Sequence, residues 1–159
     1  MSDKVLYYGR NIINSDIFQK MNKFMQHRQT TTMEHSVNVA EKALDFVERH
    51  HIKCDEESLV IGCLLHDFFL YDYHDKGYKR KKLHAFRHPT IALENAEKYF
   101  DLNDTEKEMI KKHMWPTTII FPKRKETWII VWADKTCAIR ELLNLKAKYK
   151  IRQLKKRKA

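Results

Sequence analysis

The sequence has 159 residues, of which 31 are Lys or Arg and 21 are Asp or Glu, so its formal net charge is +10. A hydrophobic content of 43% and a mean hydropathy of −0.65 exclude both a disordered chain and a protein with several membrane spans. Only three Gly and three Pro argue against a β-sandwich, which uses these residues in its turns. The cysteines, Cys54, Cys63 and Cys137, form no close pairs, and residues 1–10 show no secretory signal, so we expect a cytoplasmic protein with reduced thiols.

Most of the positive charge lies at the C-terminal end of the sequence. Residues 146–159 contain eight Lys or Arg and no acidic residue, whereas residues 1–145 contain 23 basic and 21 acidic residues, a net charge of +2. We therefore expect a domain over residues 1–145, followed by a basic tail or helix end over residues 146–159. Cations are favourable near the C-terminus of a helix, and Tyr149 is the only aromatic residue in this segment, so a solvated helix end is preferred to a nucleic-acid site.

Apolar residues recur at helical spacing along the whole chain. The predicted helices cover about residues 15–28, 32–50, 55–69, 88–99, 105–113 and 126–150, with connections over residues 70–87 and 116–124. Thr31 or Thr32 is the expected N-cap of the second helix, Pro89 suits the first position of the fourth, and Thr105 with Glu108 forms a capping-box pattern for the fifth. The predicted fold is all-α, a single-domain bundle of about six or seven helices.

Several His and Asp residues interrupt the apolar faces of these helices. His35 lies on an apolar stripe of the second helix. His66 and Asp67 directly follow the apolar run over residues 59–65. His113 and Asp134 each lie four residues after an apolar residue, on the same helix face. A buried carboxylate costs several kcal/mol unless it is paired or coordinated. Taken singly, His113 is better explained as a core histidine bonded to a carbonyl, and Asp134 could pair with an arginine. Their coincidence on four helices favours a divalent cation.

The order of these residues resembles that of a known family. His35, then His66-Asp67, then Asp134 match the His…His-Asp…Asp pattern of the HD-domain metal-dependent phosphohydrolases, over a core of roughly residues 30–145. His88 and His113 fall where members with two metals carry two further histidines, as in bacterial symmetrical dinucleoside tetraphosphate hydrolases. The Gly-Tyr-Pro signature of the branch that degrades cyclic di-GMP is absent. The resemblance assigns a first metal to His35, His66, Asp67 and Asp134, with Asp67 bridging to a second metal held by His88 and His113.

The resemblance implies a hydrolase that uses metal-activated water to cleave a phosphoester or phosphoanhydride bond of a nucleotide-like substrate. Imidazole and carboxylate ligands accept iron, manganese, zinc, cobalt or nickel, and we expect one or two ions per chain, with iron or manganese favoured. In a one-metal version, His88 and His113 would contact phosphate instead. The candidate catalytic residues are Asp67, Arg87, Lys82 and His84, the last three for the substrate phosphates and the leaving oxygen.

A non-catalytic binding module is the alternative interpretation. Its metal site would be vestigial or purely structural, and its basic tail would engage RNA or another anionic partner. The complete set of ligands favours the enzyme, so nucleic-acid binding by the tail is the less favoured hypothesis. We expect a phosphorylated small molecule as the partner, no membrane partner, and a monomer or homodimer.

Overall fold

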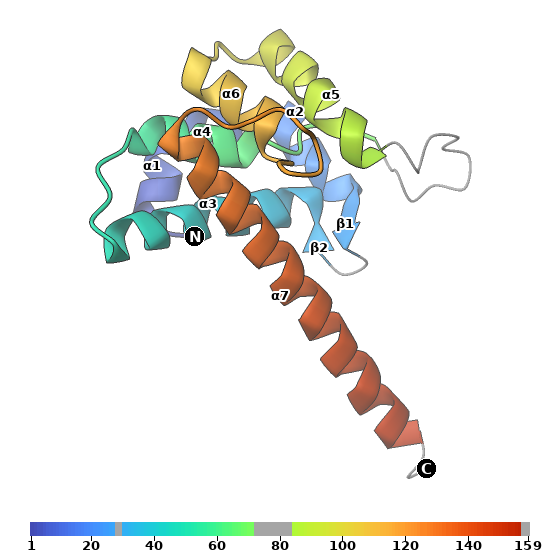
Figure 1. Cartoon of the computed structure of the whole chain (residues 1–159). Helices are drawn as coiled ribbons and strands as arrows, with labels where there is room; N and C mark the ends of the chain where they lie inside the picture. Colours follow the sequence, from blue (N-terminus) through green and yellow to red (C-terminus); the bar gives the residue numbers. More distant parts are fainter. Residues whose placement is uncertain (28–29, 72–83, 157–159) are drawn as a thin grey trace.

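Helix α4 (Glu56–Leu65) is the central element of the fold, and other helices pack against different sides of it. In the computed structural model, these include α1 (Asp3–Ile13), α3 (Thr32–Arg49) and α6 (Asp104–Lys112) (Figure 1). The structure describes residues 1–27, 30–71 and 84–156, with the backbone alone for residue 27 and residues 144–156. Within these ranges it contains seven α-helices and one short hairpin, which confirms the predicted all-α fold.

The other elements connect or flank this central group. They are α2 (Asp16–Gln19), the 3₁₀-helix η1 (Lys20–Lys23), β1 (Met25–His27), β2 (Thr30–Thr31), α5 (His84–Tyr99) and α7 (Lys125–Lys156). β1 and β2 pair antiparallel, with Met25 opposite Thr31. The N-terminal part of α7 packs against α3 and α6, and its C-terminal part projects away from the other helices (Figure 1).

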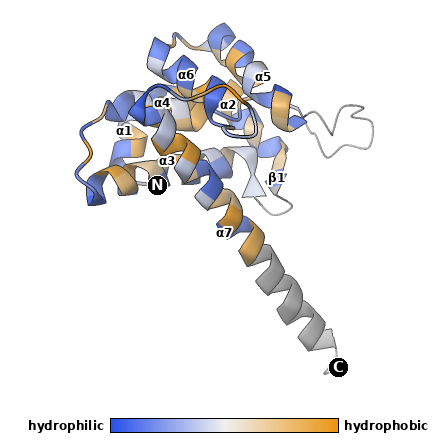
Figure 2. Cartoon of the chain, in the orientation of Figure 1, coloured by the Kyte–Doolittle hydropathy of each residue, from blue (hydrophilic) through white to orange (hydrophobic). Residues whose placement is uncertain are grey.

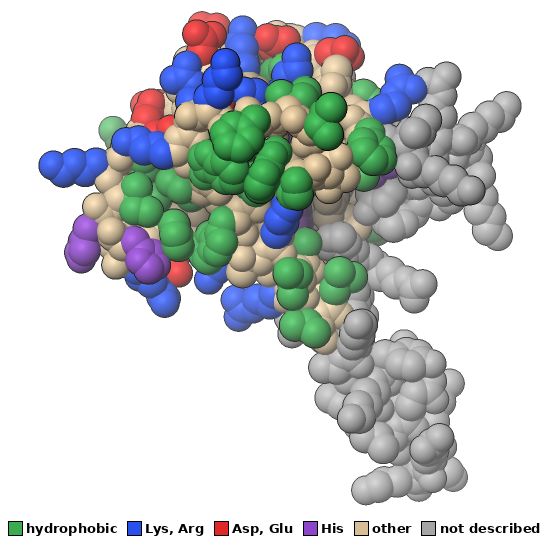
Figure 3. Space-filling model, in the orientation of Figure 1, with side chains coloured by type: hydrophobic (Ala, Val, Ile, Leu, Met, Phe, Trp, Pro, Cys, Tyr) green, Lys and Arg blue, Asp and Glu red, His purple; other side chains and the backbone are tan. Residues whose placement is uncertain are grey.

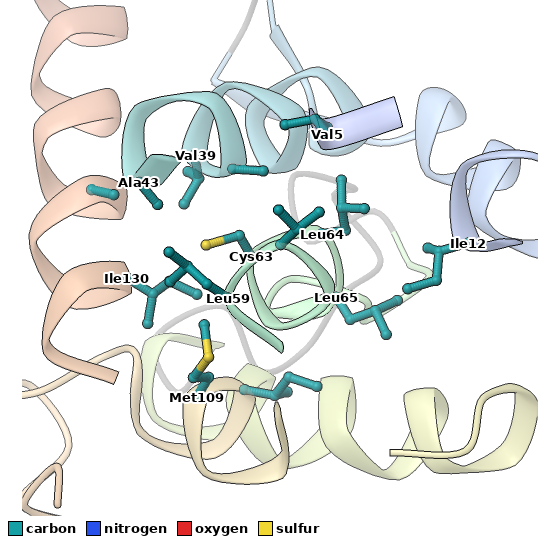
Figure 4. Close-up of a cluster of buried hydrophobic side chains, with 14 of the residues drawn as sticks. Val5, Ile12, Val39, Ala43, Leu59, Cys63, Leu64, Leu65, Met109 and Ile130 are labelled. Atoms are coloured by element: carbon teal, nitrogen blue, oxygen red, sulfur yellow. The ribbon is translucent and has the colours of Figure 1, made fainter. Parts of the chain in front are cut away.

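The core surrounds α4 because this helix is apolar on nearly all sides. Fully buried side chains of α4, α3, α6 and α7 meet there, among them Leu59, Cys63, Leu64, Val39, Ala43, Met109 and Ile130 (Figure 4). Burial of a side chain the size of Leu or Met contributes about 1.5–3 kcal/mol to the free energy of folding. Helices α5 and α6 instead alternate hydrophilic and hydrophobic residues, as expected for helices with one face in solvent (Figure 2).

Helix α6 approaches α4 closely at Gly62. A Cβ atom at this position would lie 2.6 Å from Cε and 3.1 Å from Cβ of Met109, so a side chain here would force the Met109 side chain to move. Gly62 lies four residues before His66, and Met109 lies four residues before His113. This contact therefore sets the distance between the two chain segments that carry these histidines.

An aromatic cluster and one carboxylate fix the connection between α6 and α7. The rings of Trp115, Phe121 and Trp128 pack edge to face, with centroids 4.8–6.0 Å apart. The carboxylate of Glu108 accepts the backbone N–H groups of residues 123 and 124 at 2.7 and 2.9 Å. These contacts tie the connection to α6, directly before the helix that carries Asp134. Hydrophobic side chains gather on the face of the molecule shown in Figure 3.

The N-terminal region differs from the predicted single helix over residues 15–28. α1 precedes it, with the Ser2 side chain as N-cap and Val5 buried, and the predicted span contains α2, η1 and β1. After η1, Phe24 has an extended backbone conformation and its carbonyl accepts the N–H of Thr32 at 2.8 Å, which brings the start of α3 against this segment. The prediction was wrong here because the apolar spacing continues through the 3₁₀-helix without Gly or Pro.

The second predicted helix is confirmed as α3, with a capping box of Thr31 and Glu34. The third and the last predicted helices end at other residues than expected. The third was expected to reach residue 69, but α4 ends at Leu65. The N–H of Phe68 bonds to the carbonyl of Leu65, three residues back, and that of Phe69 bonds to the carbonyl of residue 67, which tightens the chain out of the helix. The last helix was expected to end near residue 150, but α7 continues to Lys156, since residues 151–156 are helix-favouring and basic.

The starts of two further helices also differ from the prediction. α5 begins at His84, four residues before the expected start, and contains Pro89 within the helix. Proline removes one backbone hydrogen bond there, and the rest of the helix continues through it. The N-cap of α6 is Asn103, not Thr105, because the Asn103 side chain accepts the N–H groups of residues 105 and 106 at 2.9 and 3.0 Å.

Candidate metal centre

Six buried His and Asp side chains meet at the end of α4 that lies beyond Leu65. They are the six residues that the sequence pattern selected, His35, His66, Asp67, His88, His113 and Asp134. His66 and Asp67 directly follow α4, and His113 directly follows α6, so the close packing of these helices brings them together. The other three lie within α3, α5 and α7.

Asp67 stands between two groups of histidines. Its Oδ1 atom lies 3.2 Å from Nε2 of His88 and 3.6 Å from Nε2 of His113. Its Oδ2 atom lies 3.3 Å from Nε2 of His66 and 4.0 Å from Nε2 of His35. The two oxygens of one carboxylate thus face two separate sets of ring nitrogens, and each set with Asp67 has the proximity that a metal ion requires.

Asp134 completes the group on the Oδ2 side. Its Oδ1 atom lies 3.1 Å from Nε2 of His35 and 3.8 Å from Nε2 of His66. On the Oδ1 side, the Nε2 atoms of His88 and His113 are only 2.9 Å apart. We call the set of His35, His66, Asp134 and Oδ2 of Asp67 the first position, and the set of His88, His113 and Oδ1 of Asp67 the second position.

The Nδ1 atom of each imidazole has a partner outside the centre. Nδ1 of His66, His88 and His113 lies 2.8, 3.0 and 2.8 Å from the backbone carbonyl oxygens of residues 63, 84 and 110. Nδ1 of His35 lies 3.1 Å from a carboxylate oxygen of Glu141. These acceptors favour a proton on Nδ1. In a neutral imidazole this leaves the Nε2 lone pair directed at the centre, as in metal-ligating histidines.

The arrangement of the nitrogen and oxygen atoms in the centre suits coordination of a cation better than hydrogen bonds among these atoms. Among the described residues, the buried Nε2 of His66 and Oδ1 of Asp67 have no hydrogen-bond partner, although an unpaired buried polar atom costs about 1–3 kcal/mol. With the protons on Nδ1, the Nε2 atoms of His88 and His113 present lone pairs to each other at 2.9 Å. A divalent cation in each position would relieve this repulsion and coordinate the unpaired atoms.

The electrostatics of the centre keep its carboxylates ionised. Burial alone would raise the pKa of Asp134, but the hydrogen bond from His35 and the neighbouring histidines outweigh it and lower the pKa to about 2. Burial opposes protonation of His35, yet its hydrogen bonds to Asp134 and Glu141 raise its pKa to about 10. Burial, together with the neighbouring imidazoles, lowers the pKa of His113 to about 3. His113 is thus neutral at pH 7, as a ligand must be, whereas a cation in the first position has to displace a proton from His35.

The predicted catalytic residues are distributed unevenly around this centre. His84 lies beside it: its ring stacks on that of His88 with centroids 4.8 Å apart, and its Nδ1 lies 3.0 Å from the hydroxyl oxygen of Tyr71. Arg87 is exposed on α5, one residue before His88. Lys82 lies outside the described residues.

Three residues close to the centre were missed by the sequence analysis. The Gln26 side chain on β1 donates to Oδ2 of Asp67 at 2.6 Å, and Nζ of Lys135 lies 3.4 Å from the carbonyl oxygen of His113. Glu141 is the third. It follows Asp134 by seven residues, two turns of one helix, and this spacing was a usable signal. Gln26 gave none, because a helix was predicted where the hairpin lies.

The model of the HD domain family matches residues 32–139, more than half of the chain. The protein therefore belongs to the HD domain family, which is a superfamily of metal-dependent phosphohydrolases. Membership implies a divalent metal and, in general, a phosphorylated substrate. No curated protein and no solved structure matches the chain. Among the helices in the described ranges, none combines the length and the apolar character needed to cross a membrane.

Proposed function

We propose that the protein hydrolyses a phosphoester or phosphoanhydride bond of a nucleotide-like substrate, with divalent cations in the first and second positions. The observation that carries this proposal is the placement of Asp67, whose two oxygens face separate groups of histidine Nε2 atoms at 3.2–4.0 Å. One carboxylate shared by two ligand sets is the arrangement that holds two cations next to each other. Such a pair of cations supplies an activated water and positive charge for the phosphoryl oxygens.

The chain itself would bind and orient the substrate around this centre. His84 is our candidate for the proton donor to the leaving oxygen, because it borders the second position and the Tyr71 hydroxyl fixes its ring. Arg87 and Lys82 are proposed to bind the substrate phosphates, and the half-buried ammonium of Lys135 is a further cation next to the centre. No nucleophilic side chain is required, so the buried thiols of Cys63 and Cys137 keep a packing role.

Iron and manganese are the proposed metals. Both accept mixed imidazole and carboxylate ligands, which is the donor set of each position. Zinc, cobalt and nickel share this preference, so the donor set alone does not select among them.

The experiment that tests the proposed function is a substrate panel with defined metals. Protein purified without oxygen is stripped with a chelator, reloaded with iron, manganese, cobalt or nickel, and assayed on nucleotides, dinucleoside polyphosphates and cyclic nucleotides. We expect at least one substrate to be hydrolysed, and the activity to vanish in the stripped protein and return on reloading. If none of the metals supports hydrolysis of any substrate class, the proposed function is wrong.

A further inference from the structure

The four imidazoles of the centre differ in what holds their outer nitrogen. His66, His88 and His113 are held by neutral backbone carbonyls. His35 is held by a carboxylate, since both oxygens of Glu141 lie within hydrogen-bond distance of its Nδ1, at 3.1 and 3.2 Å. Among the described contacts of these four rings, this is the only one in which a side-chain carboxyl group holds Nδ1.

Glu141 reaches His35 from α7. It lies two helical turns after Asp134, so the same face of α7 presents one carboxylate to each nitrogen of the His35 ring. The Glu141 side chain is only 11% exposed and lines an open groove between α3 and α7, together with Lys42 and Arg140. The ring of His35 is therefore clamped between two carboxylates of a single helix.

From this geometry we propose that Glu141 is a positioning residue of the metal centre, and that it makes the first position bind its cation more tightly than the second. The inference rests on the two cation positions of the proposed function, but not on any substrate. Glu141 would act through His35, without touching the cation or the substrate.

The physical reason is the difference between a carboxylate and a carbonyl as the partner of a ligating imidazole. A carboxylate forms a charge-assisted hydrogen bond to Nδ1–H, which orients the ring and makes Nε2 a stronger donor to a metal. The first position is surrounded by Asp134 and Asp67 and has Glu141 behind it, whereas the second has the shared Asp67 alone. Loss of such an outer partner typically lowers metal affinity 10- to 100-fold.

The test is stepwise binding of Co²⁺ or Mn²⁺ to the stripped full-length protein, measured by competition with a chelator of known affinity. For Glu141→Ala we expect the tighter of two binding steps to weaken about 10- to 100-fold while the weaker step stays unchanged. Glu141→Gln is expected to lie between Glu141→Ala and wild type, because its amide oxygen still accepts the Nδ1–H bond but carries no charge. Glu41→Gln is the matched control, since Glu41 lines the same groove and should leave both steps unchanged.

A double-mutant cycle separates positioning from a general effect on the fold. If Glu141 acts through His35, Glu141→Ala has no further effect on affinity in a protein that already carries His35→Ala. The absorption spectrum of Co²⁺ in the first position should shift in Glu141→Ala and recover in part in Glu141→Gln. If Glu141→Ala does not fold, the isosteric Glu141→Gln decides the question alone.

The proposal is overturned if neither Glu141 variant weakens the tighter step, or if the effect persists unchanged in the His35→Ala background. This outcome is distinct from failure of the proposed function. A protein that binds metal as described but hydrolyses none of the phosphate compounds would refute the function and leave the role of Glu141 intact.

Discussion

Removal of His113 tests whether the second position holds a metal ion of its own. The imidazole of His113 is buried, and its Nε2 lies 2.9 Å from Nε2 of His88 and 3.6 Å from Oδ1 of Asp67. His113→Ala leaves these two groups as the only described ligands of that position, while the first position keeps all of its ligands. Since the loss of an outer partner already costs 10- to 100-fold, the loss of a direct ligand should cost at least about 100-fold, or about 2.8 kcal/mol of binding free energy.

The assay is elemental analysis of protein purified without oxygen and freed of excess metal. We expect about two ions per chain in the wild type and about one in His113→Ala. Ile12→Ala is the control for packing, because Ile12 is buried on α1, which carries none of the six ligands. It should lower the free energy of unfolding by about 2–5 kcal/mol but keep both ions. The reasoning fails if His113→Ala retains two ions at wild-type affinity, or if Ile12→Ala loses one as well.

Three further predictions concern the helix contact, the connection before α7, and the basic tail. Gly62→Ala should lower the free energy of unfolding by up to about 2 kcal/mol in denaturant titrations, since overpacking against Met109 (about 1–3 kcal/mol) exceeds the gain in helix propensity (about 1 kcal/mol). It should also weaken binding of the metal ion in the second position. A more stable variant with unchanged metal binding would contradict this prediction. Burial would raise the pKa of Glu108, but its bonds from the N–H groups of residues 123 and 124 and from Lys112 lower it below its usual range. A carboxyl group whose pKa is lowered in the folded state stabilises the protein at pH values above its unfolded-state pKa of about 4.3. Glu108→Gln should therefore be less stable by about 1–2 kcal/mol at pH 7, and this difference should shrink as the pH falls through the lowered pKa. A stability difference independent of pH refutes this prediction. Deletion of residues 146–159 should leave hydrolysis intact and abolish any salt-sensitive binding of polynucleotides. If the deletion abolishes hydrolysis, the tail is required for activity and the prediction is wrong.

The sequence was sufficient to select the six residues of the centre because a local physical signal marks most of them and the resemblance to the HD family added His88. A His or Asp within an apolar stripe is costly to bury, and this signal is visible without knowledge of the fold at His35, His113 and Asp134. Capping residues and apolar spacing likewise located α3 to within a residue. These features depend on neighbours in the chain, which a sequence contains directly.

Features that depend on long-range contacts were not predictable. Gln26 reaches Asp67 only because residues 20–27 form a 3₁₀-helix and a strand, where the apolar spacing indicated a continuous helix. The pairing of His35 with Glu141 joins residues 106 positions apart. α4 ends at Leu65 through hydrogen bonds of the following turn, which the apolar pattern up to residue 69 conceals. In the first two cases the decisive contact comes from tertiary structure, whereas the hydrogen bonds that end α4 are local but have no counterpart in the apolar pattern.

The most direct test of the central claim is the rate of phosphate release by the metal-loaded protein compared with Asp67→Asn, measured on the best substrate at the same metal concentration. Asn keeps the size of the side chain but removes the charge that both positions share, and the Gln26 hydrogen bond is still possible. We predict that Asp67→Asn folds, binds fewer metal ions and loses at least about 100-fold in rate. If Asp67→Asn hydrolyses the substrate at the wild-type rate, a metal centre built on Asp67 is not the site of the reaction.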